Sequence, residues 1–237
     1  MKLSRSIAVL TALLLTAPAL PAAAAQPVRS LTTESIYKEG DPTHSIIDDE
    51  AKERYDDAMQ PVRDFSQGVT RMANRYVKSG GGDTGSAACV VHWMATWARA
   101  DALTDIGSRQ TALSLTRILS GVTLAYLEVA SANGIDAKDQ DALKPWLKTL
   151  GRTTMSVYDG QRNSDLGNHR YWGGLAAAAI AVATGDRAMF DWAMDSYRLG
   201  VCQVDRDGAL PIELSRGKRA RDYHIYPLAA LAMLAEI

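Results

Sequence analysis

A helical spacing of apolar side chains constrains the fold of this chain more than any other sequence feature. Between residues 48 and 78 the apolar positions recur three or four residues apart: Ala51, Tyr55, Ala58, Val62, Phe65, Val69, Met72 and Tyr76. This spacing places them on one face of a helix. Pro61 lies inside the segment and predicts a kink there. The segment is therefore expected to form a long amphipathic helix.

The same kind of spacing continues along most of the chain. It predicts further helices over residues 87–104, 110–132, 138–158, 169–184, 187–204 and 219–237, joined by glycine-rich or polar connectors. The alternation of apolar and polar residues that is typical of strands is nowhere sustained. Residues 26–46 have little periodicity and are expected to form an extended or looped lead-in. We therefore predict an all-α fold of antiparallel neighbouring helices in one domain, residues 26–237.

The first 25 residues have the pattern of a secretory signal peptide. Lys2 and Arg5 precede an apolar run at residues 7–17, and residues 22–25 offer an A-x-A cleavage site. The apolar run is shorter than the roughly 20 residues that a bilayer span needs, and we expect no later span. A lipobox cysteine is absent near the cleavage site. The mature protein is therefore expected in the periplasm without a membrane anchor.

Charge and cysteine content narrow the possible partners. The chain has 26 basic and 27 acidic residues, which argues against a nucleic-acid partner. An anionic ligand would therefore have to be met by local cations. Cys89 and Cys202 are expected to form a disulfide or to be buried thiols. The four histidines, His44, His92, His169 and His224, do not have the spacing of zinc ligands. The sequence also contains no phosphate-binding or dinucleotide-binding loop, so we expect no metal and no cofactor.

Two stretches concentrate side chains that suit proton transfer beside an anion. Residues 167–172 read Gly-Asn-His-Arg-Tyr-Trp, which includes Asn168 and His169. Arg216 and Tyr223 lie seven residues apart and share a face if their segment is helical. Abstraction of a proton next to a carboxylate needs donors around that carboxylate, a base and an acid. This set fits β-elimination from a uronic-acid polysaccharide, although each residue alone could be structural and the basic cluster could be a solvated face.

Trp93 and Trp97 lie four residues apart on one predicted helix face. Paired tryptophans of this kind usually pack in a core. They could also form a wall on which sugar rings stack, because pyranose C–H faces lie well against flat apolar rings. The sequence leaves both interpretations open.

Several motifs, in the same order, resemble the periplasmic alginate lyases of polysaccharide lyase family 5. They are the Asn-His-Arg-Tyr-Trp run at 168–172, Phe-Asp-Trp-Ala at 190–193, Gln-Val-Asp at 203–205, Leu-Pro-Ile-Glu-Leu at 210–214, residues 216–226, and Trp-Met-Ala-Thr-Trp-Ala-Arg-Ala at 93–100 after Cys89. The resemblance covers nearly all of the mature chain. It implies an α/α toroid that cleaves mannuronate-rich alginate by β-elimination and leaves an unsaturated uronate at the non-reducing end.

The resemblance also implies roles for individual residues. Asn168 and Arg216 would neutralise the substrate carboxylate. Tyr223 would act as the acid and also as the base for mannuronate, and His169 would act as a base or assist in neutralisation. The expected substrate-binding residues are Lys38 in the lead-in, Arg170, Tyr171, Trp172, Trp93, Trp97 and Arg219.

Two departures from the family pattern leave alternatives. Gly167 stands where a second Asn is expected, and Arg170 stands where Ser is usual. The extra cation at position 170 could widen the preference to other polyuronates, such as hyaluronan or polyglucuronate. The family continues well past residue 237, so the toroid is expected to be incomplete here. We expect a monomer that acts on an anionic polysaccharide, and a non-catalytic exported carbohydrate-binding protein is the remaining alternative.

Overall fold

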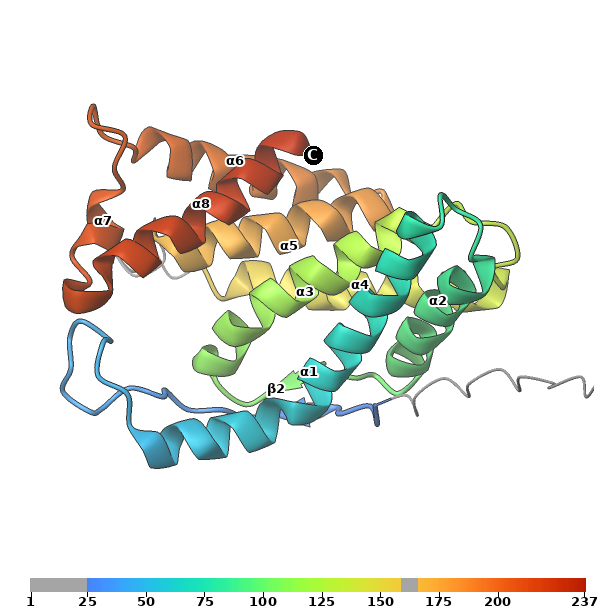
Figure 1. Cartoon of the computed structure of the whole chain (residues 1–237), viewed down its shortest axis with the longest axis horizontal. Coiled ribbons are helices and arrows are strands. Elements are labelled where there is room, and N and C mark those ends of the chain that lie inside the picture. Colours follow the sequence, from blue (N-terminus) through green and yellow to red (C-terminus); the bar gives the residue numbers. More distant parts are fainter. Residues whose placement is uncertain (1–24, 159–165) are drawn as a thin grey trace, which may run out of the picture.

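The computed structural model describes residues 25–158 and 166–237, and the signal-peptide prediction lies almost entirely outside them. The all-α prediction is confirmed, since helices dominate the described residues (Figure 1). In chain order the helices are α1 Asp49–Lys78, α2 Thr84–Arg99, α3 Arg109–Val129, α4 Ala137–Ser156, α5 Asn168–Thr184, α6 Arg187–Cys202, α7 Pro211–Leu214, the 3-10 turn η2 Gly217–Arg219, and α8 Ala220–Glu236.

Short polar side chains set where most of these helices begin. Each N-cap side chain accepts a hydrogen bond from a backbone N–H of the first turn, which satisfies a group that the helix itself cannot. These N-caps are Asp48, Asp83, Ser108, Asp136 and Asp186. Gly185 ends α5 in the left-handed conformation, with φ of 70°.

α2 ends earlier than its apolar pattern predicts. The predicted helix runs to residue 104, but the chain leaves the helix after Arg99 and turns through positive φ at Asp101 and Leu103. The chain then forms a two-residue strand, β2 (Asp105–Ile106), which pairs in parallel with β1 (Ser30–Leu31) in the lead-in. This pairing ties the lead-in to the start of α3.

α5 is the central helix and packs against α3, α4, α6 and α8 (Figure 1). Its small side chains allow this close packing. An added Cβ on Gly174 would lie 2.8 Å from the Ser196 Cβ on α6, so a larger residue would push the two helices apart. The alanines at positions 176–179 have no exposed surface.

Two long helices bear on predictions from the sequence. α1 runs unbroken through Pro61, and it changes direction along its length in Figure 1, as the proline predicts.

α3 is long and apolar enough to cross a membrane by composition alone, contrary to our expectation that no later stretch would qualify. More than half of its most apolar window is buried inside the protein, which is typical of a core helix.

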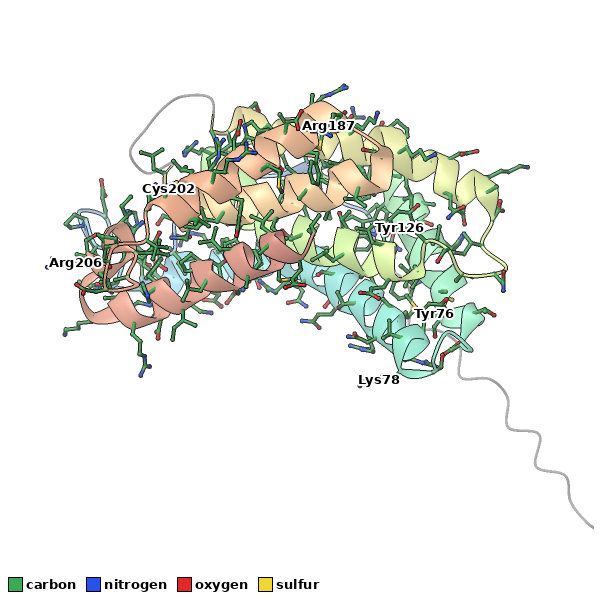
Figure 2. The ribbon with its side chains drawn as sticks, turned by 90° about the horizontal axis from the view of Figure 1, so that it is seen from above. Tyr76, Lys78, Tyr126, Arg187, Cys202 and Arg206 are labelled. Carbon is green, nitrogen blue, oxygen red and sulfur yellow. The ribbon has the colours of Figure 1, made fainter. Side chains whose placement is uncertain are left out.

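The two cysteines are free and lie on different helices. Cys89 is half-buried in α2, whereas Cys202 is exposed at the end of α6, next to the turn that carries Arg206 (Figure 2). Both predictions for Cys202, a disulfide and a buried thiol, are therefore wrong. The sequence pattern around it is apolar, but the last turn of α6 presents Val201 and Cys202 to solvent.

Segments far apart in sequence meet at one end of the helix bundle. The first turns of α3 and α5, the α7–η2 turn with the start of α8, and the lead-in loop at 36–47 lie together at the left of Figure 1. Within the loop, an antiparallel bridge joins Tyr37 to Ile47. This end of the molecule carries the pocket described next.

Candidate active site

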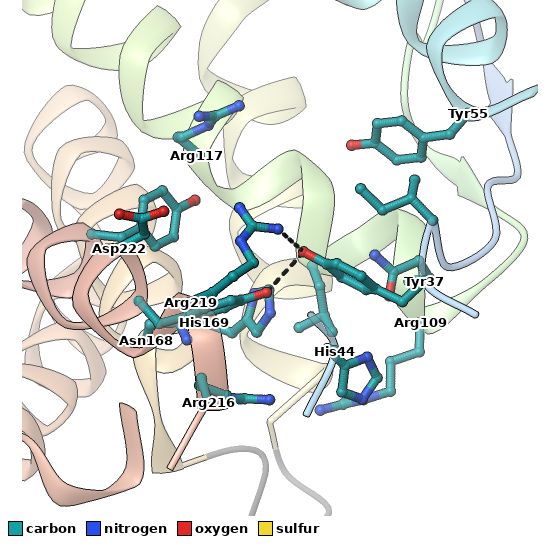
Figure 3. A pocket seen from close by; sticks show the side chains of 15 residues that line it. Tyr37, His44, Tyr55, Arg109, Arg117, Asn168, His169, Arg216, Arg219 and Asp222 are labelled. Atoms are coloured by element: carbon teal, nitrogen blue, oxygen red, sulfur yellow. Dashed lines mark hydrogen bonds between the residues drawn. The ribbon is translucent and has the colours of Figure 1, made fainter. Parts of the chain in front are cut away.

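A pocket of about 620 Å³ opens where these segments meet (Figure 3). All four predicted catalytic residues, Asn168, His169, Arg216 and Tyr223, line it. They come from the start of α5, the turn before η2, and α8. The structure therefore brings together two sequence stretches that are more than 40 residues apart.

Asn168 is fixed at the bottom of this pocket by a buried carboxylate. Its backbone N–H donates to Glu213 Oε1 over 2.7 Å, and its side-chain Nδ2 donates to Glu213 Oε2 over 2.9 Å. Asn168 is 1% exposed and Glu213 is 0% exposed. Arg216 Nε lies 3.9 Å from the same Glu213 Oε2. One carboxylate thus joins the amide and the guanidinium that were predicted to bind the substrate carboxylate.

Tyr223 also lines the pocket, and it contacts the lead-in loop. Its hydroxyl lies 2.8 Å from the hydroxyl of Tyr37, which also accepts a hydrogen bond from Arg219 at 3.1 Å. The guanidinium carbons of Arg216 and Arg219 lie 5.1 and 5.5 Å from the centre of the Tyr223 ring. In Figure 3 the dashed lines mark the two hydrogen bonds that meet at the Tyr37 hydroxyl.

The environment of Tyr223 favours its protonated form. Burial and the Tyr37 hydroxyl raise its pKa, and the two nearby arginines lower it by less. The family resemblance implies that Tyr223 is also the base for mannuronate, a role that would need a lowered pKa. Desolvation outweighs the cations, so this phenol keeps its proton at neutral pH.

The environment of His169, in contrast, favours its deprotonated, neutral form. Burial lowers its pKa to about 4, with contributions from Arg216, Arg109 and His44. A histidine with this pKa is neutral at pH 7 and can accept a proton. Its backbone carbonyl accepts a hydrogen bond from the Tyr158 hydroxyl at 2.6 Å, which fixes the turn that carries it.

Several residues that line the pocket were not singled out from the sequence. Arg109 and Arg117 come from α3, Tyr226 from α8, Tyr55 from α1, and His44 from the lead-in loop. The two arginines lie eight residues apart in an otherwise apolar helix, a spacing that keeps them on neighbouring parts of one face. That pattern was the available signal, but nothing in the sequence indicates which face meets the pocket.

Cations dominate the pocket wall. Among the described residues that line it are four arginines (Arg109, Arg117, Arg216 and Arg219) and one carboxylate, Asp222. Such a wall suits a polyanion in a protein whose net charge is only −1. The described part of the chain brings no group of three or more potential metal-binding side chains together.

Three predicted substrate-binding residues lie away from the pocket. Arg170 donates to the Ser196 hydroxyl at 2.8 Å and stacks 3.9 Å from the centre of the Trp192 ring, so it faces α6. Tyr171 is 0% exposed and donates to Gln203. Trp97 is also fully buried and stacks on Phe65. The sequence could not separate these packing positions from pocket positions, because consecutive residues of a helix point in different directions.

The remaining predicted residues differ in their relation to the pocket, which neither Trp93 nor Lys38 lines. Arg219 lines the pocket, and Trp172 packs against the pocket residue Tyr226 with ring centres 5.0 Å apart. Trp93 is half-buried beside Gly68 on α1. Lys38 is exposed and lines a shallower hollow on the lead-in loop.

Comparison with known proteins agrees with this picture. The family model described as alginate lyase matches residues 105–237. A polysaccharide lyase of Stenotrophomonas maltophilia (strain K279a) is 31% identical over the whole chain and 71% of its own length. The chain belongs to the alginate lyase family. An alginate lyase of Pseudomonas aeruginosa (strain LESB58) is likewise 31% identical, over 87% of this chain.

Solved structures of the family have the same fold. A variant of alginate lyase A1-III complexed with tetrasaccharide has a TM-score of 0.78, at 23% identity over 92% of this chain and 62% of its own. Alginate lyase A1-III from Sphingomonas species A1 gives 0.73 over 89% and 59%. This likeness confirms the α/α toroid. The chain spans 57% of the length of the Pseudomonas relative.

Proposed function

We propose that this protein is a polysaccharide lyase that cleaves alginate by β-elimination. The observation that carries the proposal is the convergence of Asn168, His169, Arg216 and Tyr223 in one arginine-rich pocket. Membership of the alginate lyase family and the names of the relatives support alginate as the substrate.

The proposed reaction begins at the substrate carboxylate. Asn168 and Arg216 donate hydrogen bonds to it and stabilise the negative charge that develops when the neighbouring carbon loses its proton. His169, neutral because of its low pKa, takes that proton. The electron pair left on the carbon forms a double bond to the next ring carbon.

The second half of the reaction releases the leaving sugar. The bond between that next ring carbon and the glycosidic oxygen breaks, and Tyr223 gives its proton to the oxygen. The raised pKa of Tyr223 supports this acid role, because the phenol is protonated when substrate arrives. The products are a sugar with a free hydroxyl and an unsaturated uronate at the new non-reducing end.

Absorbance near 235 nm tests the proposal directly, because the unsaturated uronate absorbs there. The mature protein is mixed separately with polymannuronate, polyguluronate, hyaluronan and polyglucuronate. We expect the fastest rise with polymannuronate. No rise with any polymer, from protein that is helical by circular dichroism, would contradict the proposal and favour a carbohydrate-binding role.

We also propose that the protein is exported to the periplasm, acts as a monomer and carries no membrane anchor. The pattern of residues 1–25 supports export. Fractionation of expressing cells tests the export and the lack of an anchor, and the mass of the purified protein in solution tests the monomer. An uncleaved chain in the cytoplasm or in the membrane pellet would contradict the proposal.

A further inference from the structure

Glu213 is a buried charged group without a place in the reaction above. It lies in α7, is 0% exposed, and presents both carboxylate oxygens to groups of the pocket. Oε1 accepts the backbone N–H of Asn168, and Oε2 accepts the Asn168 side-chain amide and lies 3.9 Å from Arg216 Nε. A carboxylate is costly to bury unless such partners compensate for the lost water.

These contacts decide the orientation of the Asn168 amide. A carboxylate oxygen can only accept, so the Asn168 side chain must turn Nδ2 toward Glu213 and Oδ1 away from it. Nδ2 carries a second N–H, for which the described residues provide no acceptor and which can therefore donate to a ligand. Asn168 Oδ1 is buried and has no hydrogen-bond partner in the described part of the protein. The amide is therefore held by its nitrogen alone, on the side that faces Arg216.

Gly167 is the second element of this arrangement. A Cβ added at Gly167 would lie 2.7 Å from Glu213 Oε1, closer than real Cβ atoms approach an oxygen. Any larger residue at position 167 would displace the carboxylate from the start of α5. The glycine, which departs from the sequence pattern expected of the family, thus makes room for the contact between Glu213 and the Asn168 backbone.

We propose that Glu213 is a positioning residue that holds Asn168 and Arg216 in the geometry in which both donate to the substrate carboxylate. The inference rests on the proposed lyase function and deepens it. Glu213 acts through the two donors and does not touch the substrate. Gly167 permits this role by leaving space for the carboxylate.

Charge alone predicts a different behaviour for the same residue. A negative group behind the carboxylate-binding site opposes the binding of an anion, so its neutralisation should lower KM and should not slow turnover. A positioning role predicts that kcat falls while KM changes little, because the lost geometry matters most in the transition state. The split between kcat and KM therefore separates the two roles.

The first variant is Glu213→Gln, which keeps the volume and removes the second acceptor. The Gln side chain would let the Asn168 amide rotate, since it offers a donor to Asn168 Oδ1. We expect kcat on the preferred polymer to fall about 10²-fold, the usual effect of misplacing a reacting group by an ångström. KM should stay within about twofold.

Gly167→Ala disrupts the same contact by changing the Asn168 side of it instead of Glu213. It provides a second test in case Glu213→Gln does not fold. We expect a similar loss of kcat, and we expect the two substitutions together to cost little more than either alone, because they break one interaction.

Asp139→Asn is the matched control. Asp139 is a buried carboxylate on α4 that pairs with Arg99 and His92 away from the pocket, so its loss should lower the melting temperature without changing kcat.

The outcomes distinguish this inference from the proposed function. If wild-type protein forms no unsaturated uronate, the proposed function fails. If wild-type protein is active and folded Glu213→Gln keeps its kcat, the positioning role fails while the lyase function stands. Fully additive losses in the double variant would also overturn the role, because independent effects would mean that Gly167 and Glu213 do not share one contact.

Discussion

The two sides of the pocket are built in different ways. At the Asn168 side, a fully buried carboxylate from α7 fixes the first residue of the central helix. At the Tyr223 side, a half-buried phenol meets a residue of the lead-in loop 186 positions away, through one contact between hydroxyls. The first side is held by two charge-assisted bonds to a fully buried carboxylate. On the second side a contact between two half-buried hydroxyls is supplemented by one hydrogen bond from Arg219.

This difference indicates where the proposed chemistry needs rigidity. A hydrogen-bond donor that stabilises developing charge is most effective when it is already in place, since no reorganisation is then needed. A side chain that donates a proton to a departing oxygen can tolerate more freedom of movement. We expect changes at Glu213 and Asn168 to affect the geometry of the donors, and changes at Tyr223 to affect proton transfer to the leaving oxygen.

The largest effect is expected from Tyr223→Phe. This variant removes the proposed acid but keeps the ring that packs between Arg216 and Arg219. Turnover should fall by roughly 10²- to 10⁴-fold, the usual span for one acid–base group, while polymer binding stays close to wild type. Absorbance at 235 nm gives the rate, and titration calorimetry with intact polymer gives the affinity. Near-full activity would remove Tyr223 from the proton-donor role.

Acidification should act first on the Asn168 side, through His169. The pKa of His169 is lowered to about 4 from an ordinary value near 6.5. If His169 is the base, the acid limb of kcat/KM should fall near pH 4 rather than near 6.5. A limb at 6.5 would show that the histidine titrates as an ordinary exposed one.

The same pKa has a consequence for stability. Between pH 6.5 and 4 the unfolded chain binds a proton at this position that the folded protein excludes, so stability is lost as the pH falls through that window. His169→Gln should therefore lose less stability than wild type between pH 7 and pH 4.5. Melting temperatures at both pH values measure this difference, and equal losses would contradict it.

A smaller effect is expected from Tyr37→Phe, which tests the contact between the lead-in loop and α8. The variant removes the hydroxyl that meets Tyr223 and accepts from Arg219. The bond to Tyr223 joins neutral groups and contributes about 0.5–1.5 kcal/mol, and the bond from Arg219 does not involve the proposed acid, so turnover should fall about three- to tenfold. Steady-state rates at 235 nm measure it. A loss as large as that of Tyr223→Phe would show that this side is as tightly constrained as the other.

The helical fold was readable from the sequence because its signals are local. Apolar spacing placed each long helix within a few residues, and the predicted end of α5 at residue 184 is the observed one. The exception was the end of α2, where a turn through Asp101 and Leu103 and the pairing with β1 override an apolar run. That pairing joins residues 75 positions apart, and no local pattern encodes it.

The four residues predicted to be catalytic could be grouped from the sequence for a different reason, and the structure brings them to one pocket. Asn168, His169, Arg216 and Tyr223 are chemically distinctive and recur in order in a known family. Glu213 was visible in the sequence, but an acidic residue in a cationic stretch has no local mark of burial. Its role depends on the approach of α7 to α5, which is a property of tertiary packing.

The prediction for Arg170 differs most from its position in the structure. Its substitution is expected to have the smallest effect on activity. The family resemblance implies that this cation binds substrate, where it could broaden specificity. In the structure it lies behind the Asn168 side, bonded to Ser196 and stacked on Trp192. Arg170→Ser should therefore leave the ranking of the four polymers unchanged and lower the free energy of unfolding by about 1–2 kcal/mol.

Arg219→Ser is the matched comparison, since Arg219 lines the pocket and bonds Tyr37. It should raise KM for the polymer with little change in stability, because a cation near solvent contributes more to anion binding than to folding. Denaturant titration and 235 nm kinetics on both variants separate the two cases. A changed substrate ranking in Arg170→Ser at unchanged stability would mean that this arginine reaches the polymer after all, and that the rigid side of the pocket rearranges when substrate binds.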